Sequence, residues 1–270
     1  MYSTLMVYLE PHRDNTHLLA ATRDLAERSG AAVIGVSAGR QFYLGYAVRG
    51  VSGDIFELDR QEIQRSMAAA ESGFRAALEQ PGRHVEWHAI VTSSPPIGQL
   101  ASQVRSADLV ITGAERGGTS GVDAGDLVMR AGRPVLVVPA GIDRLTARNV
   151  LVAWKDAPEA RRAISDGLVF LKTAGRVQVV EIADAEGIAE ARRSVEDVVQ
   201  WLKRHGIEAE GKAVPETGDH ALQLAAIAEE EGADLIIAGA YGHSRFHEWV
   251  LGGVTSDLLL RSRVPTLLSH

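Results

Sequence analysis

Apolar residues gather along this chain in short runs that alternate with longer segments of helical spacing. The first run, residues 4–9, predicts a buried strand, and Leu18, Leu19 and Leu25 then recur at the spacing of one helix face. Gly30 follows the last of these and marks a helix end. The pattern therefore predicts a strand followed by an amphipathic helix, and the same alternation continues almost to the last residue.

The alternation predicts a full set of elements. The predicted strands are 4–9, 31–37, 84–91, 108–113, 134–138, 149–154, 177–182, 207–214, 234–238 and 265–268. The predicted helices are 15–29, 59–80, 96–106, 126–131, 158–171, 190–205, 220–231 and 254–261. Residues 39–53, rich in glycine and aromatic side chains, predict a long loop.

The chain repeats itself at long range. In sequence, residues 107–114 align with residues 233–240 at an offset of 126. Residues 126–134 align with residues 257–265 at an offset of 131. The two copies therefore differ by a loop that is five residues shorter in the first. A repeat of this length predicts two domains, residues 1–142 and 148–270, with the boundary between them.

Strands alternating with helices predict an α/β fold in which each domain is a doubly wound, largely parallel sheet. Right-handed crossovers place ligand sites of such sheets at the carboxyl ends of the strands. Glu10, Gly113, Lys155 and Gly239 all fall at such ends.

Composition narrows the class of protein. The formal charge of −7 argues against broad binding to nucleic acid or to an anionic membrane, and the apolar content of 46% is that of a soluble protein. The absence of cysteine excludes disulfides and thiolate catalysis. The first residues lack the pattern of a signal peptide, and no run has the ~18 apolar residues of a membrane span. We therefore expect a cytoplasmic protein.

The most informative stretch follows the strand at 234–238. Glycines at Gly239, Gly242, Gly252 and Gly253 punctuate a loop that precedes the helix predicted at 254–261. Such a loop exposes backbone N–H groups, and the helix N-terminus favours negative charge. The loop therefore predicts a phosphate or nucleotide site; the alternative is a loop that only closes the sheet.

At this point the chain resembles the universal stress protein family in its tandem two-domain form. Gly239-x-x-Gly242, nine further residues and then Gly252 match the spacing of the family's nucleotide loop, and residues 150–154 and 263–268 resemble its first and last strands. The resemblance implies five-stranded Rossmann-like domains of the adenine nucleotide alpha hydrolase-like type with strand order 3-2-1-4-5. It also implies pairing of domains through their last strands, homo-oligomers, a role in stress response, and ATP or another adenine nucleotide as ligand.

The departures from the family's pattern bear on the ligand. Members that bind ATP usually carry Asp where this chain has Lys155, which has donors and no acceptor. Gly253 stands where the family has Ser or Thr, whereas Val254 and Thr255 match. The first copy has the carboxylate of Glu10 but a short loop, with Arg116 at the place of the second glycine. The resemblance thus implies one degenerate site, in the second copy.

Other residues leave alternatives open. Trp154 either packs in the core or borders an adenine pocket, and Lys155 either contacts phosphate or is a solvated lysine. His243 and His247 have helical spacing, but a third ligand is not identifiable, so no metal is expected. No catalytic motif follows a strand, so we expect a regulatory or protective binding protein and no enzyme. The alternatives are an interaction protein that acts through dimerisation, with residues 42–46 as one contact surface, and an enzyme on a small phosphorylated substrate.

Overall fold

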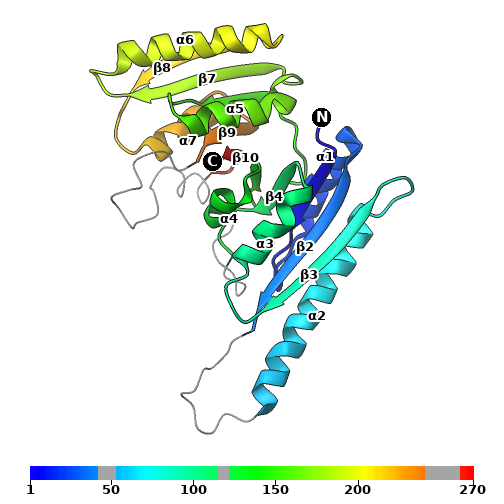
Figure 1. Cartoon of the computed structure of the whole chain (residues 1–270). Coiled ribbons are helices and arrows are strands. Elements are labelled where there is room, and N and C mark those ends of the chain that lie inside the picture. Colours follow the sequence, from blue (N-terminus) through cyan, green and yellow to red (C-terminus); the bar gives the residue numbers. More distant parts are fainter. Residues whose placement is uncertain (42–52, 115–121, 241–261) are drawn as a thin grey trace.

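The computed structural model describes residues 1–41, 53–114, 122–240 and 262–270. Their strands form one ten-stranded sheet in the order β3-β2-β1-β4-β5-β10-β9-β6-β7-β8. Figure 1 shows the two halves of the chain side by side, each with helices against its part of the sheet.

Each half contributes five strands. The first half contains β1 Thr4–Tyr8, α1 Thr16–Ser29, β2 Ala32–Arg40, α2 Gly53–Leu78, β3 Val85–Thr92, α3 Ile97–Gln103, the 3-10 turn Val104–Ser106, β4 Leu109–Gly113, α4 Ala124–Ala131 and β5 Val135–Val138. The second half contains β6 Asn149–Ala153, α5 Pro158–Leu171, β7 Arg176–Ala183, α6 Ile188–Arg204, β8 Glu210–Pro215, α7 His220–Glu230, β9 Leu235–Gly239 and β10 Thr266–Ser269.

The strand order confirms the predicted fold. Within the first half the order is β3-β2-β1-β4-β5, and the second half repeats it as β8-β7-β6-β9-β10, so both read 3-2-1-4-5. The pairs inside each half are parallel. The two last strands pair antiparallel, with Leu267 opposite Leu136, which confirms the expected pairing of the halves through these strands. The domain boundary between residues 142 and 148 stays a prediction.

Buried apolar side chains cover both faces of the sheet. One cluster joins the strands to α1, α2, α5 and α6 through Leu25, Phe74, Ile164 and Val198, among others. The other joins them to α3, α4 and α7 through residues such as Leu100, Leu127 and Leu224. The central strands are therefore buried on both sides, which explains why they appear in the sequence as continuous apolar runs. The edge strands β3 and β8 are mostly half-buried or exposed.

The repeated aspartate has the same structural task in both halves. The carboxylate of Asp108, just before β4, accepts hydrogen bonds from the backbone N–H groups of Ser3 and Thr4 at 2.8 and 3.0 Å. The carboxylate of Asp234, just before β9, accepts from those of Arg148 and Asn149, both at 2.9 Å. Each aspartate thus satisfies backbone donors beside the first strand of its half.

Contacts outside the sheet also join the halves. The hydroxyl of Tyr2 donates to the carbonyl oxygen of Asp166 in α5 at 3.0 Å, and its ring meets that of Phe170 edge-on at 5.8 Å. Burial, and after it the carboxylates of Asp166 and Asp108, raise the pKa of Tyr2. Arg28 of α1 donates to the carbonyl of Leu145 in the connecting segment.

The loop predicted at residues 39–53 is wrong at both of its ends. Gly39 belongs to β2, and Gly53 is the first residue of α2, six residues before the predicted start. A Cβ at Gly39 would lie 2.5 Å from Cγ2 of Ile63. The absence of a side chain at Gly39 therefore allows α2 to pack against the strand, and this glycine does not mark a loop. Residues 42–52, including Phe42–Tyr46, lie outside the described part of the chain.

Candidate functional site

The strand order reverses direction at the centre of each half, between β1 and β4 and between β6 and β9. At such a point the connections on the carboxyl side leave in opposite directions, and open α/β sheets bind ligands there. Glu10 and Gly113 lie at this edge in the first half, and Lys155 and Gly239 lie at it in the second. The predicted position of these residues is confirmed.

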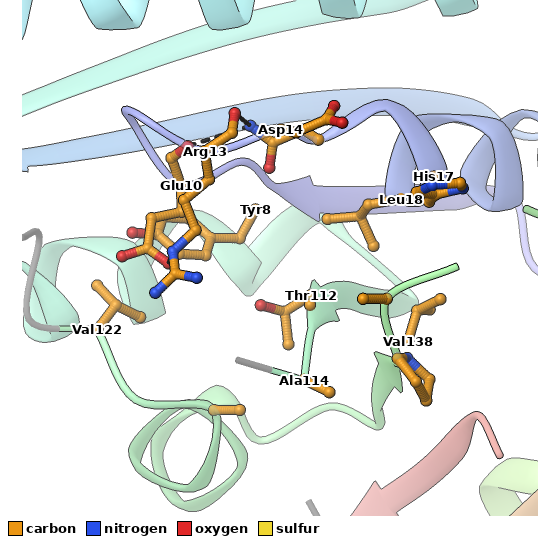
Figure 2. A pocket seen from close by; sticks show the side chains of 15 residues that line it. Tyr8, Glu10, Arg13, Asp14, His17, Leu18, Thr112, Ala114, Val122 and Val138 are labelled. Carbon is orange, nitrogen blue, oxygen red and sulfur yellow. Dashed lines mark hydrogen bonds and ion pairs between the residues drawn. The ribbon is translucent and has the colours of Figure 1, made fainter. Parts of the chain in front are cut away.

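The first half has a small pocket at this edge, of about 80 Å³. Its lining residues are Tyr8, Glu10, Arg13, Asp14, Asn15, His17, Leu18, Thr112, Gly113, Ala114, Val122, Ala124, Val138, Pro139 and Ala140. Figure 2 shows the guanidinium of Arg13 pointing into it, between Val122 and Thr112. Ligand pockets usually measure about 300–1,000 Å³. This volume suits a few waters or a phosphate and is too small for a nucleotide.

Arg13 also neutralises Glu10, the carboxylate that the sequence predicts at the end of the first strand. Its Nε lies 3.0 Å from Oε2 of Glu10, and the Glu10 side chain is 12% exposed. A carboxylate held in this way is less available as an acceptor for a ribose hydroxyl.

The helix that follows the first pocket supplies its own N-cap. Asp123 precedes α4, and its side chain accepts from the backbone N–H groups of Gly125 and Asp126 at 2.8 and 3.4 Å. Two of the N–H groups that could hold an anion at this helix start are therefore already in use. Within the described residues, the first half has neither the space nor the free donors for a nucleotide.

The second half differs at the matching glycine. A Cβ at Gly239 would lie 2.5 Å from the backbone nitrogen of Ala160 and 2.7 Å from the carbonyl carbon of Glu159. Gly239 is therefore needed for the close approach of β9 to the first turn of α5. Nothing described lies within 4 Å of a Cβ at Gly113, the matching residue of the first half.

The helix start beside Gly239 has no side-chain cap. The N-cap residue of α5 is Ala157, which makes no side-chain hydrogen bond, and Pro158 follows. First-turn N–H groups without such a partner carry the positive end of the helix dipole. Glu159 in this turn has a buried Oε2 that no hydrogen bond satisfies. This edge of the sheet thus offers donors for an anion and one carboxylate acceptor.

The predicted ligand residues Trp154 and Lys155 directly follow β6, and their environments differ. Trp154 is 7% exposed and packs with Val150 and Val152 on the α5–α6 face, where its indole N–H donates to Oγ of Ser194 at 2.7 Å. Lys155 is exposed at the edge. Trp154 therefore lies beside the predicted loop site and faces the helices.

The remaining predicted ligand residues, Gly242, Gly252, Gly253, Val254 and Thr255, lie outside the described part of the chain, and their role stays a prediction. The same holds for His243 and His247. In the residues that are described, no three side chains of His, Asp or Glu gather as metal ligands would.

Sequence reasoning missed a larger pocket of about 410 Å³ between α5 and α6. Several of its residues recur along one face of α6, where Glu190, Ser194, Asp197 and Trp201 follow one another at intervals of three or four. This mixture of polar and aromatic side chains at helical spacing was the available signal.

Comparison with known proteins agrees with these observations. The family model of the universal stress protein family matches residues 146–270. A universal stress protein of Methanocaldococcus jannaschii is 32% identical over 79 residues, which make up 29% of this chain. The match spans 48% of that protein, about half of its length.

Solved structures match over nearly the whole chain. A universal stress protein from Archaeoglobus fulgidus has a TM-score of 0.70 at 16% identity, covering 98% of this chain and 97% of that one. A protein from Pseudomonas aeruginosa UCBPP-PA14, described as a universal stress protein, has a TM-score of 0.61 at 15% identity, covering 99% and 93%. At these identities the likeness concerns the fold. Residues 146–270 therefore match the universal stress protein family, and the fold of the chain is that of solved universal stress proteins.

Proposed function

We propose that this protein is a stress-response module that binds a phosphate group or an adenine nucleotide at one degenerate site in its second half. It acts in the cytoplasm by binding, with no chemical turnover. The match of residues 146–270 to the universal stress protein family supports the stress-response role. Among the described helices, none has both the length and the apolar character that a membrane crossing requires.

The observation that carries the binding site is the contact between Gly239 and the uncapped start of α5. The 2.5 Å approach of a Cβ at Gly239 to the Ala160 nitrogen places first-turn N–H groups beside the start of the glycine loop. An anion held by that loop gains from the helix dipole, an effect of about 0.3–1 kcal/mol at exposed sites. The first half lacks the matching contact, because nothing described lies within 4 Å of a Cβ at Gly113, and the Asp14 carboxylate already accepts from the N–H of Thr16, the first residue of α1, at 2.9 Å.

Recognition of the nucleoside part of a ligand has less support than recognition of its phosphate. Lys155 replaces the usual carboxylate and supplies no acceptor. Glu159, with its unsatisfied Oε2, is the nearest alternative acceptor that the described residues of this turn provide. Phosphate recognition is therefore stronger here than recognition of the sugar or the base.

The interaction-protein alternative gains no support from the last strands. β5 and β10 already pair with each other within one chain, so they are not open edges for a second copy. No described observation favours the enzyme alternative.

Calorimetry of the full chain with ATP, ADP, AMP and inorganic phosphate, with and without Mg²⁺, tests the site. We expect weak, saturable binding that inorganic phosphate competes for and that Gly252→Val abolishes. Gly121→Val, in the shortened loop of the first half, is the matched control and leaves binding unchanged. Lys155→Asp, which restores an acceptor, strengthens binding of AMP and does not strengthen binding of phosphate. Absence of both heat and thermal shift with every ligand would overturn the nucleotide proposal and leave the fold untouched.

A further inference from the structure

A groove of about 410 Å³ lies between α5 and α6, close to the end of β6. Its lining residues are Trp154, Asp156, Arg161, Ile164, Glu190, Ser194, Asp197, Val198 and Trp201. The volume falls within the ordinary range for small-molecule pockets, about 300–1,000 Å³. All of these residues belong to the described part of the chain, so the groove can be analysed side chain by side chain.

The floor and walls of the groove are apolar and aromatic. Trp154 and Ile164 are 7% and 3% exposed, and Val198 is 8% exposed. Trp201, which is half-buried, stands at the other end with its ring 4.3 Å from the ring of His205. Two indoles and two branched aliphatic side chains make a surface that holds an apolar body and offers aromatic faces to a cation.

Carboxylates dominate the polar lining. Asp156, Glu190 and Asp197 face one cation, Arg161. Asp156 already pairs with Arg161, and Glu190 pairs with Arg193, which is not part of the lining. Asp197 has no ion-pair partner among the described residues. The lining therefore carries excess negative charge, and one carboxylate is free to meet a ligand.

A buried carboxyl group lies behind the lining. Glu181 of β7 is 9% exposed and hydrogen-bonded to Ser194, while its Oε2 has no hydrogen-bond partner. Ser194 in turn accepts the indole N–H of Trp154 at 2.7 Å. Glu181 adds negative potential beneath the groove whenever it is ionised, and its unsatisfied oxygen is a second, independent sign of an incomplete polar site.

Among the described residues of the first half, the matching helices α1 and α2 pack directly against each other. A Cβ at Gly73 of α2 would lie 3.7 Å from Cδ1 of Leu19 in α1. The two halves share their strand order, but among the described residues α5 and α6 do not pack together as α1 and α2 do.

We propose that the α5–α6 groove binds a small organic ammonium ion that carries an aromatic or branched apolar body. The apolar body lies against Trp154, Ile164 and Val198, and the ammonium group meets the Asp197 carboxylate and the face of Trp201. Anionic ligands are disfavoured, because no lining cation is free to pair with them. The site is separate from the proposed phosphate site and does not depend on it.

Three probes with the same ring and different charge test the proposal on the full chain. They are 2-phenylethylamine, 2-phenylethanol and phenylacetate, each followed by tryptophan fluorescence and by calorimetry. We expect the amine to bind at least tenfold more tightly than the alcohol, and phenylacetate to show no saturable binding. Equal affinity for all three probes, or tighter binding of phenylacetate, would overturn the proposal.

Two variants of α6 locate the binding site. Asp197→Asn is expected to weaken binding of the amine severalfold and to leave binding of the alcohol unchanged. Glu196→Gln removes the same charge from the neighbouring exposed position, which does not line the groove, and is expected to change neither. Equal effects of the two variants would show a general charge effect and contradict the assignment. Saturating ATP is expected to leave the amine affinity unchanged, and competition between the two would also contradict it.

Discussion

Gly239 has a packing role that its place in a glycine-rich loop does not reveal. Backbone atoms of α5 occupy the space that a side chain at this position would need, at 2.5–2.9 Å from a Cβ. Backbone cannot rotate away as a flexible side chain can, so any substitution has to push β9 and α5 apart. The first glycine of the motif therefore serves the fold as well as any ligand.

Gly239→Ala is expected to destabilise the protein strongly, by about 2–4 kcal/mol, because overpacking of a closed site shifts the backbone. Gly113→Ala, at the matching position of the first half, meets open space among the described residues and changes stability by less than about 0.5 kcal/mol. Urea unfolding of the two variants measures the difference. Similar stabilities would show that β9 and α5 are not in this close contact.

Glu181 makes stability depend on pH. Burial is the largest cause that raises its pKa, Asp156 and Glu190 raise it further, and Ser194 and Lys155 lower it. Because its pKa in the folded state lies above that in the unfolded state, the folded state binds more protons between the two values. The contribution of Glu181 to stability is therefore fully present below the unfolded pKa and is lost as pH rises through the folded pKa.

Glu181→Gln removes this titration and keeps a side chain of the same shape. Relative to the wild type, the variant is expected to gain stability as pH rises from about 4 to 7. Thermal unfolding at several pH values measures the difference, with Glu196→Gln as the exposed control. A difference between variant and wild type that stays constant with pH would contradict the raised pKa.

Two helix starts, each at the carboxyl ends of the strands of its own half, are built in opposite ways. Asp123 satisfies the first N–H groups of α4, whereas α5 begins with Ala157 and Pro158 and has no side-chain cap. By the order of elements in the repeat, the counterpart of α5 in the first half is α1, whose N-cap residue Asn15 also makes no side-chain cap hydrogen bond. The start of α4 therefore has a carboxylate acceptor from its own chain, whereas the start of α5 has none among the described residues.

Asp123→Ala is expected to lower stability by about 1 kcal/mol, because the N–H groups of Gly125 and Asp126 lose their acceptor. Asp123→Asn keeps an acceptor and removes the charge, so its stability should stay close to that of the wild type. Denaturant unfolding compares the two. An equal loss in both variants would assign the effect to charge, contrary to the capping geometry.

The sequence predicted most elements because the central strands are apolar runs that are buried on both faces. It failed where tertiary packing gives a residue an unusual role. Gly39 looked like part of a loop but admits Ile63 of α2 against β2. The groove between α5 and α6 was also missed, because the distance between two helices is set by side chains that are far apart in the sequence.

At the scale of the whole molecule, the repeat correctly predicted two halves of one topology, and the family resemblance predicted how they pair. Of the candidate site, the sequence placed Gly239 and Lys155 at the correct edge. The sequence did not predict that Arg13 would neutralise Glu10 at 3.0 Å, or that Asp123 would cap α4. Both depend on local side-chain geometry that no motif encodes.

The antiparallel pairing of β10 with β5 predicts how the halves behave when separated. In the full chain, Thr266–Leu268 lie opposite Val137–Val135, and Tyr2 covers part of α5 beside Phe170. A separately produced segment of residues 148–270 would expose the edge of β10 and this apolar surface. An exposed, apolar edge strand pairs readily with another chain, and antiparallel pairing of two identical edges gives a closed twofold dimer.

We therefore expect residues 148–270, once their folding has been checked by circular dichroism, to form a dimer in light scattering coupled to size exclusion. Adding residues 1–142 should convert it to a one-to-one complex, because β5 restores the original partner together with the contact of Tyr2. A Tyr2→Ala version of the first segment should compete less well, whereas Arg23→Ala, an exposed position on α1, serves as the control. If residues 148–270 stay monomeric and do not bind residues 1–142, the result would contradict the view that β10 and β5 hold the two halves together.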